Sequence, residues 1–230
     1  MSKPNCLGII PARGGSKRLA NKNILTFANK PLIYWTFLAA QQSEGITEVV
    51  VSTDSPNIAS VCASLSINCP FIRPKDLATD AATSEAVVLH ALERMPGYDY
   101  VALLQPTSPL RTAEDIDGSL RLMFDRKSLS CVSVAKTNKP KFQAYSMSPT
   151  NHLFPVSDSF SERNPGKRMF FTPNGALYLA STEAVKSSGS LYTDDIIGYE
   201  MPLERSVDID TIEEFKLAEK QFLKFNPPKQ

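Results

Sequence analysis

The chain has 230 residues, which is long enough for one well-formed core, and its 42% hydrophobic and 21% charged residues are typical of a globular protein in water. Lys plus Arg total 25 and Asp plus Glu total 24, so the near-zero balance argues against a general nucleic-acid binder. No apolar run approaches the length of a membrane span and the first residues are too polar for a signal peptide, so we expect a cytoplasmic protein with no membrane partner.

Apolar, β-branched runs alternate with segments of helical period from the N-terminus to about residue 135. In chain order, the pattern predicts a strand at 6–12, a helix at 31–42, a strand at 49–53, helices at 55–65 and 84–94, a strand at 100–104, a helix at 113–124 and a strand at 131–135. Strands alternating with helices indicate an α/β fold, with a mostly parallel sheet covered by helices on both faces.

The alternation stops near Thr137. Residues 138–173 are rich in proline and polar residues and show no clean period, so we interpret them as an excursion from the main sheet, formed as a small antiparallel arm. Strands at 174–180 and 196–201 and an amphipathic helix at 211–222 complete the chain. We therefore expect a nucleotide-binding domain of residues 1–137 and 174–230, interrupted by the 138–173 arm.

A glycine-rich, basic loop follows the first strand directly, with the sequence Pro11-Ala-Arg-Gly-Gly-Ser-Lys-Arg18. Ligands of an open parallel sheet bind beyond the carboxyl ends of its strands, and backbone amides at Gly14 and Gly15 can approach a phosphate closely. The cations of this stretch are Arg13, Lys17, Arg18 and Lys22. The loop is typical of a triphosphate cradle; the alternative is a flexible basic surface loop. It matches neither a Walker A loop nor the dinucleotide fingerprint.

Four segments, in order along nearly the whole chain, resemble the acylneuraminate cytidylyltransferase family. They are Ile10-Pro-Ala-Arg-Gly-Gly-Ser-Lys-Arg-Leu19 with Lys22-Asn23, Leu104-Gln-Pro-Thr-Ser-Pro-Leu-Arg111, Pro173-Asn-Gly-Ala-Leu-Tyr178 and Asp208-Ile-Asp210. The resemblance implies a Rossmann-like nucleotidyltransferase sheet with a dimerisation arm. It also implies a homodimer and a reaction in which the anomeric hydroxyl of a nine-carbon sugar acid attacks the α-phosphate of CTP, releasing pyrophosphate.

On the nucleotide side, the resemblance implies that Arg13 and Lys17 contact the triphosphate and that Asn23 holds the nucleoside. Thr83 and Ser84 either cap the helix that follows or meet the cytosine, with Arg73 as a second base-side candidate. The expected nucleotide-binding residues are Arg13, Gly14, Gly15, Ser16, Lys17, Lys22, Asn23, Arg73, Thr83 and Ser84. Asp54, at the end of a strand, is interpreted as a turn or capping residue and left out of the site.

Asp208 and Asp210 flank Ile209, so an extended segment places both carboxylates on one side. By resemblance this is the family's metal pair, and hard oxygen ligands suit Mg²⁺ as the cofactor. The alternative is that Asp210 simply caps the last helix. Together with Arg13 and Lys17, the two aspartates are the expected catalytic residues.

The expected sugar-side residues are Gln105, Ser108, Arg111, Lys141, Arg163, Arg168 and Tyr178. Arg111 is either a ligand contact or the partner of Glu114 or Asp115. Relatives often carry Arg directly before Pro-Asn-Gly, whereas this chain has Thr172, so we expect Arg163 or Arg168 to hold the sugar carboxylate. The alternative is that both are solvated loop charges. By resemblance, Tyr192 takes part where the arm meets a partner subunit.

Two further functions remain open at this point. One is a cytidylyltransferase of the same fold that acts on the eight-carbon acid Kdo. The other is a nucleotide-binding regulator without activity, against which the intact Lys17 and aspartate pair argue, because a sensor needs no catalytic metal pair.

Overall fold

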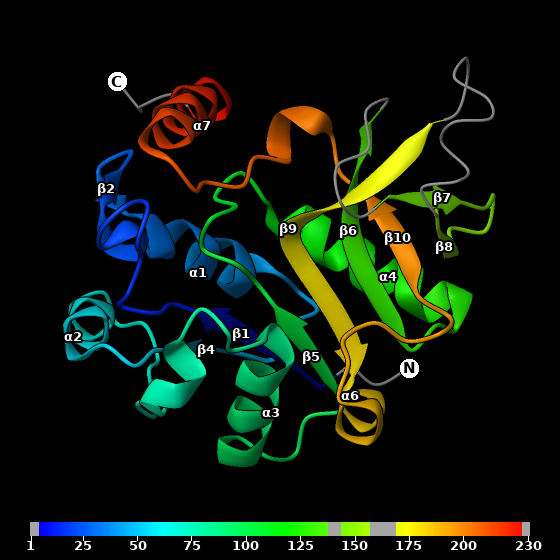
Figure 1. The fold of residues 1–230 in the computed structure, drawn as a ribbon, viewed down its shortest axis with the longest axis horizontal. Helices are drawn as coiled ribbons and strands as arrows, with labels where there is room; N and C mark the ends of the chain where they lie inside the picture. The colour runs from blue at the N-terminus through cyan, green and yellow to red at the C-terminus, as the bar shows by residue number, and fades with distance from the viewer. Residues whose placement is uncertain (1–4, 138–143, 157–168, 227–230) are drawn as a thin grey trace.

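The computed structural model describes residues 5–137, 144–156 and 169–226. Its central feature is an eight-stranded sheet whose main path runs β10-β6-β9-β5-β1-β4, with β7 and β8 attached beside β9 (Figure 1). The strands are β1 (Cys6–Pro11), β4 (Glu48–Ser52), β5 (Tyr100–Leu103), β6 (Ser130–Thr137), β7 (Tyr145–Met147), β8 (Leu153–Pro155), β9 (Phe170–Ser181) and β10 (Ile197–Glu200); β2 (Thr26–Phe27) and β3 (Lys30–Pro31) form a separate hairpin.

The sheet is mostly parallel, as predicted. Strand β1 runs parallel to β4 and β5, and β10 runs parallel to β6. Along the main path, β9 is antiparallel to both of its neighbours, β5 and β6. The carboxyl ends of β1, β4 and β5 therefore meet at one edge, where the basic loop and Gln105 leave the sheet.

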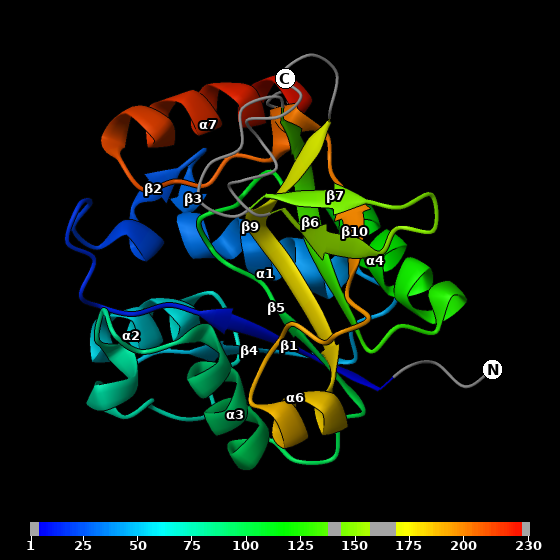
Figure 2. The ribbon, with the colours of Figure 1, turned by 45° about the vertical axis from the view of Figure 1, so that its right-hand side comes forward.

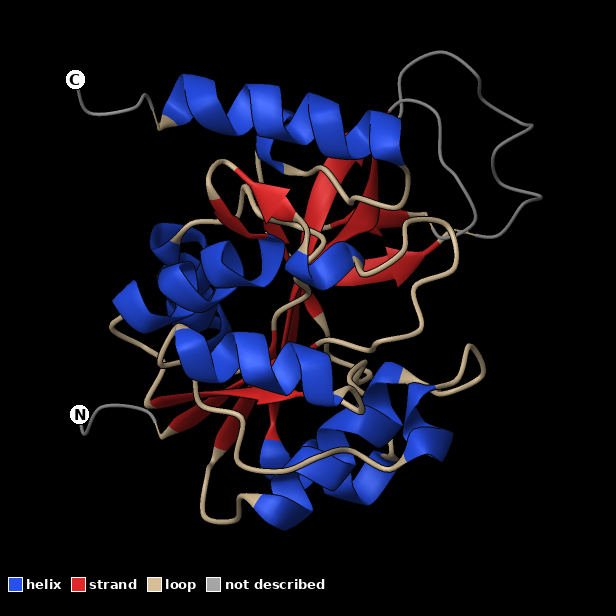
Figure 3. Cartoon of the chain, turned by 90° about the vertical axis from the view of Figure 1, so that its left-hand side faces the viewer, coloured by secondary structure: helices blue, strands red, loops and turns tan. Residues whose placement is uncertain are grey.

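Helices cover both faces of the sheet (Figure 3). They are α1 (Leu32–Gln42), α2 (Pro56–Ser64), α3 (Ser84–Arg94), α4 (Ala113–Arg126), α6 (Thr182–Ser188) and α7 (Ile212–Phe225), with 3-10 turns η1 (Lys22–Ile24), η2 (Lys75–Ala78) and η3 (Leu203–Arg205).

The two faces follow from the alternation of side chains along β1. Cys6 and Ile10 pack into a core with α1, α2 and α4, whereas Leu7 and Ile9 pack into a second core with α3 and α6. All four side chains are fully buried. Apolar residues on both faces explain why the strand is an unbroken hydrophobic run.

The last helix, α7, packs at the edge of the sheet against the β2–β3 hairpin and α1. Phe27 meets Phe215 and Phe222 edge-on, with ring centroids 5.3 Å and 5.4 Å apart. Ile209, fully buried, joins this cluster. Its burial fixes the segment that carries the two aspartates of the predicted metal pair.

The excursion differs from the prediction at its end. Strand β9 begins at Phe170, so residues 170–173 belong to the main sheet and pair with β6. Pro173 made the segment look like a loop, but it pairs with Val134 beside a register shift between β6 and β9, where a missing amide is tolerated. Strands β7 and β8 form an antiparallel hairpin that pairs with β9 (Figure 2). Residues 138–143 and 157–168 of the predicted arm lie outside the described residues.

Among the described residues, no helix combines the length and apolar character needed to cross a membrane. The four cysteines are free, and burial raises the pKa of Cys6, Cys62 and Cys131 to about 12. Thiols with such a pKa are inert at neutral pH, so these three act as core residues.

Candidate active site

A cavity of about 570 Å³ opens at the sheet edge where β1 and β5 end and α3 begins. It brings together residues from four separate parts of the chain, as a ligand site at the carboxyl ends of parallel strands requires. The predicted site residues that line it are Arg13, Ser16, Lys17, Lys22, Asn23, Arg73, Thr83, Ser84, Gln105, Asp208 and Asp210.

The glycine-rich loop is anchored to the end of β4. The Gly14 amide donates to Asp54 Oδ1 at 2.9 Å, and a Cβ on Gly14 would lie 2.9 Å from Ser55 Cβ. Gly14 was expected to offer its amide to a phosphate, but here that amide is used to hold the loop. The Asp54 carboxylate also favours the charged form of Arg73 nearby. Asp54, interpreted from the sequence as a turn or capping residue outside the site, does not line the cavity and instead holds the loop that does.

Arg13 and Lys17 share one carboxylate. Asp80, on the turn that follows η2, contacts Arg13 Nη1 at 2.8 Å and Lys17 Nζ at 2.5 Å. Hydrogen bonds from Lys17 and Arg13 lower the pKa of Asp80. Asp80 lines the cavity, and sequence reasoning missed it because no local pattern marks a lone acidic residue in a turn.

The other two cations of the loop contact Asp210, one of the two aspartates of the predicted metal pair. Lys22 Nζ donates to the Ile209 carbonyl at 2.6 Å and to Asp210 Oδ1 at 3.0 Å, and Arg18 Nη1 lies 2.8 Å from Asp210 Oδ2. Lys22 therefore joins the first loop to the segment before α7, across most of the sequence.

The alternative role of Asp210 as a helix cap is wrong. Thr211 caps α7: its hydroxyl accepts from the Glu214 amide at 3.2 Å, and Glu214 Oε2 accepts from the Thr211 amide at 2.9 Å. Since this capping box is complete, the Asp210 carboxylate is left to face Arg18 and Lys22.

Asp208 faces the same cavity. Desolvation by the surrounding protein, and then the nearby Asp210 charge, raise the pKa of Asp208, while hydrogen bonding to Thr107 lowers it. Ile209 also donates its amide to the Thr107 carbonyl at 2.9 Å. The loop after β5 thus holds the aspartate segment in place, with both carboxylates on the side opposite buried Ile209.

The carboxylate oxygens of Asp208 and Asp210 are ligands that suit Mg²⁺. Two carboxylates supply hard oxygen ligands, and Mg²⁺ usually takes one or two of these and completes its octahedron with water and phosphate oxygens. In the described part of the chain no group of three or more His, Cys, Asp or Glu side chains is placed to hold a metal. The remaining ligands would therefore come from substrate and water.

Two predicted sugar contacts in the Gln105 loop are wrong. Arg111 is buried, and its Nη1 donates to the carbonyls of Ala176 at 2.8 Å and Gln105 at 3.3 Å; burial lowers its pKa to about 10. It pairs with neither Glu114 nor Asp115, the two predicted partners. Ser108 is fully buried and does not line the cavity. Arg111 supports the loop through its side chain, whereas Ser108 does so through backbone hydrogen bonds with Gln105 and Arg111.

Gln105 itself remains in the cavity, opposite the bulge of β9. Gly175 has φ +79°, and a Cβ there would lie 3.2 Å from Gln105 Oε1 and 3.5 Å from Asp208 Oδ2. Only glycine lets β9 pass this close. Gln105, predicted to contact the sugar, and Asp208, predicted to bind the metal, therefore both lie beside Gly175.

On the predicted base side, Thr83 caps α3 by accepting from the Ala86 amide at 3.2 Å, and both Thr83 and Ser84 line the cavity. Arg73 is almost completely buried, and desolvation lowers its pKa. Asn23 is also buried, and its Nδ2 donates to the Arg13 carbonyl at 3.1 Å. Asn23 therefore holds the first loop in addition to lining the cavity.

The predicted sugar side is only partly described. Tyr178 packs edge-on against Tyr192, with ring centroids 6.1 Å apart, and burial raises the pKa of Tyr178 to about 12. Tyr178 does not line the cavity. Three predicted cations lie outside the described residues: Lys141, Arg163 and Arg168.

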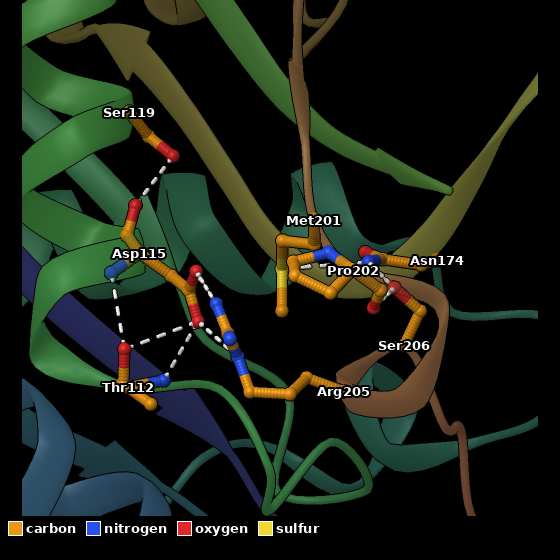
Figure 4. A network of polar contacts seen from close by, with 8 residues as sticks. All are labelled: Thr112, Asp115, Ser119, Asn174, Met201, Pro202, Arg205 and Ser206. Atoms are coloured by element: carbon orange, nitrogen blue, oxygen red, sulfur yellow. Dashed lines mark hydrogen bonds and ion pairs between the residues drawn. The ribbon is translucent and has the colours of Figure 1, made fainter. Parts of the chain in front are cut away.

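A polar network fixes the segment that leads to Asp208 (Figure 4). Arg205 donates twice to buried Asp115, through Nη2 at 2.5 Å and Nε at 3.3 Å. Asn174 Nδ2 donates to Ser206 Oγ at 2.9 Å. These contacts hold η3 against the start of α4 and against β9. They therefore fix the position of the residues that directly precede Asp208.

We expect Arg205→Ala to lower the free energy of unfolding by about 2–4 kcal/mol, because it leaves the Asp115 carboxylate buried without its partner. Arg121→Ala, an exposed arginine on the same helix as Asp115, is the matched control and should change stability by about 0.5 kcal/mol or less. Urea unfolding of both variants measures the difference; equal effects would show that the Asp115–Arg205 pair does not stabilise the fold.

The chain is similar to known proteins over nearly its whole length. A family model described as cytidylyltransferase matches residues 7–220. An N-acylneuraminate cytidylyltransferase of Escherichia coli is 36% identical over 92% of this chain, which spans about half of that relative's length (51%). A CMP-N,N'-diacetyllegionaminic acid synthase of Legionella pneumophila is 35% identical over 93% of this chain and 94% of its own. A pseudaminic acid cytidylyltransferase of Campylobacter jejuni is 30% identical over 92% of this chain and 94% of its own length.

A solved structure with a similar fold is a CMP:2-keto-3-deoxy-manno-octonic acid synthetase complexed with CTP. Its TM-score is 0.81 at 17% identity, over 96% of this chain and 99% of that one. A 4-diphosphocytidyl-2C-methyl-D-erythritol synthase of Anaerococcus prevotii has a TM-score of 0.64 at 13% identity, over 97% of this chain and 100% of that one. At these identities the likeness concerns the fold.

Proposed function

The chain belongs to the cytidylyltransferase family, and from this premise we propose that it transfers CMP from CTP to the anomeric hydroxyl of a nine-carbon sugar acid, with release of pyrophosphate. The observation that carries the proposal is the convergence at one cavity of the loop cations Arg13 and Lys17, the aspartates Asp208 and Asp210, and Gln105. Three relatives named for nine-carbon acids support the substrate class.

In this proposal the site acts by positioning groups and stabilising charge, which is how proteins accelerate transfer of phosphorus groups. Arg13 and Lys17 bind the β- and γ-phosphates and stabilise the pyrophosphate that leaves. Asp208 and Asp210 hold Mg²⁺, which when bound neutralises charge on the phosphate oxygens. Lys22 keeps the aspartate segment against the loop, since its Nζ contacts both Ile209 and Asp210. Gln105 orients the sugar acid.

The donor nucleotide is tested by pyrophosphate release with CTP, UTP, ATP and GTP, each with a nine-carbon sugar acid and Mg²⁺. The proposal requires release with CTP to exceed release with the other three nucleotides by a large factor. Equal release with all four would contradict it, because the phosphate cradle alone accepts any triphosphate.

We expect Gly14→Ala to raise the KM for CTP roughly tenfold or more, because small displacements of a phosphate-positioning loop are costly. The added Cβ would lie 2.9 Å from Ser55 Cβ, so the loop must shift. Gly15→Ala is the matched control: nothing lies within 4 Å of its Cβ position. Steady-state kinetics on both variants measures the contrast. A Gly14→Ala enzyme with the KM of Gly15→Ala would remove the Gly14–Asp54 anchor from the account.

The proposal includes a homodimer in which the segment from 138 to 173 reaches the partner subunit. Its described part presents exposed apolar side chains, Phe154 on β8 and Met169 just before β9. Analytical ultracentrifugation should find a dimer; a fully active monomer would refute this part of the proposal.

A further inference from the structure

The cavity contains a carboxylate that no step of the proposed reaction uses. Asp80 contacts the two cations that the proposal assigns to the β- and γ-phosphates, Arg13 at 2.8 Å and Lys17 at 2.5 Å. Each of its oxygens binds a different cation. This is the way in which one phosphate group would bridge the same two side chains, at the distances usual for charged hydrogen bonds.

The ion pairs of Asp80 with Arg13 and Lys17 lie where an incoming anion can replace the Asp80 carboxylate. Asp80 lies on a turn between η2 and α3, closed by one hydrogen bond from the Ala82 amide to the Thr79 carbonyl at 3.3 Å. Its side chain is about half exposed, at 51%, and that of Lys17 is exposed at 79%. An anion entering the cavity therefore displaces the carboxylate by side-chain rotation, without breaking a helix or a strand.

We propose that Asp80 is a specificity-determining residue that competes with the pyrophosphate part of the nucleotide for Arg13 and Lys17. A ligand that reaches these cations must displace Asp80, whereas a nucleoside monophosphate held on the base side does not. Asp80 therefore weakens the binding of pyrophosphate and of the triphosphate tail selectively. After transfer it returns to the two cations and favours release of pyrophosphate over release of the CMP-sugar acid.

This inference rests on the proposed function for the identity of the ligand, but its test does not need a sugar acid. Isothermal titration calorimetry measures the dissociation constants of inorganic pyrophosphate and of CMP for the wild-type protein, Asp80→Asn and Asp80→Ala. We expect both variants to bind pyrophosphate about three- to tenfold more tightly, the range given by two exposed ion pairs, and to bind CMP within about twofold of the wild type.

Asp76→Asn is the matched control, since Asp76 is an exposed aspartate in the adjacent η2 turn and contacts neither cation. It should leave pyrophosphate binding within about twofold of the wild type, because a separated surface charge is screened. Unchanged or weaker pyrophosphate binding in the Asp80 variants would overturn the inference. So would an equal gain for CMP, or an equal gain in Asp76→Asn, because either would indicate a general charge effect.

The outcome is separable from that of the proposed function. If the Asp80 variants bind pyrophosphate more tightly while the wild-type protein forms no CMP-sugar acid, the competition stands and the proposed reaction fails. If the reaction occurs and pyrophosphate binding is unchanged, only the role of Asp80 fails.

Discussion

Asp208→Asn is expected to lower kcat/KM by about 10²-fold or more, because it removes a ligand of the proposed metal ion and with it the charge stabilisation of the phosphate oxygens. The substitution should leave the fold intact. Desolvation raises the pKa of Asp208, so the Asp208 carboxyl group binds its proton more tightly in the folded chain than in the unfolded chain. Above that pKa, the ionised carboxylate therefore subtracts from stability, and replacing it with an amide does not lower the melting temperature.

The matched control for Asp208→Asn is Glu213→Gln, which removes an exposed carboxylate in the first turn of α7 outside both the cavity and the capping box. Steady-state kinetics over a range of Mg²⁺ concentrations, with thermal unfolding of each variant, measures both effects. Near-normal turnover of Asp208→Asn at ordinary Mg²⁺ would exclude this residue from metal binding, and so would an equal loss in Glu213→Gln.

Lys17→Ala is expected to reduce turnover by about 10²-fold or more, the scale seen when one preorganised electrostatic contact to developing charge is lost. Its effect should fall on kcat, because negative charge builds on the pyrophosphate as the bond to the α-phosphate breaks. The Lys17 side chain is 79% exposed and pairs with Asp80, so the melting temperature should not change.

Lys75→Ala removes another exposed lysine close in sequence to Asp80 but outside the cavity, and it should retain wild-type turnover. A comparison of kcat for the two variants, each at saturating CTP and sugar acid, decides the matter. If Lys17→Ala keeps a kcat close to that of Lys75→Ala, then Lys17 is not part of the mechanism.

Local patterns in the sequence predict the sheet, and they predict which segments line the cavity at its edge. Helix α3 spans Ser84–Arg94, as expected from its period and its capping threonine. The loop from Arg13 to Asn23 lies at the sheet edge because it follows a buried parallel strand. In each case the information is local: side-chain alternation, a cap, or a position after a strand.

The errors arise where tertiary contacts decide. Arg111 carries a charge that the sequence alone would place at a ligand or an acidic neighbour, yet its guanidinium is buried against two carbonyl groups. The partner of Asp115 is Arg205, which comes from the far end of the chain. Asp80 lines the cavity, and Asp54 anchors the first loop, only because the fold brings the η2 turn and the end of β4 beside that loop. No local pattern encodes such pairings.

We propose that an arginine between residues 138 and 173 holds the sugar carboxylate, because Thr172 stands where relatives often carry Arg. This position pairs with Ala135 in the sheet and supplies a hydroxyl but no charge. The candidates are Arg163 and Arg168, both outside the described residues. In this proposal, selective loss of sugar affinity in Arg163→Ala or Arg168→Ala, with an unchanged KM for CTP, identifies the carboxylate ligand.

The most direct test of the central claim is mass spectrometry of the products formed from CTP and Mg²⁺ with a mixture of N-acetylneuraminic, diacetyllegionaminic and pseudaminic acids and Kdo. We predict a CMP conjugate of a nine-carbon acid, formed in amounts equal to the pyrophosphate released and at a rate about 10²-fold or more lower with Asp208→Asn. A CMP conjugate of Kdo alone, or CTP binding without any conjugate, would contradict it.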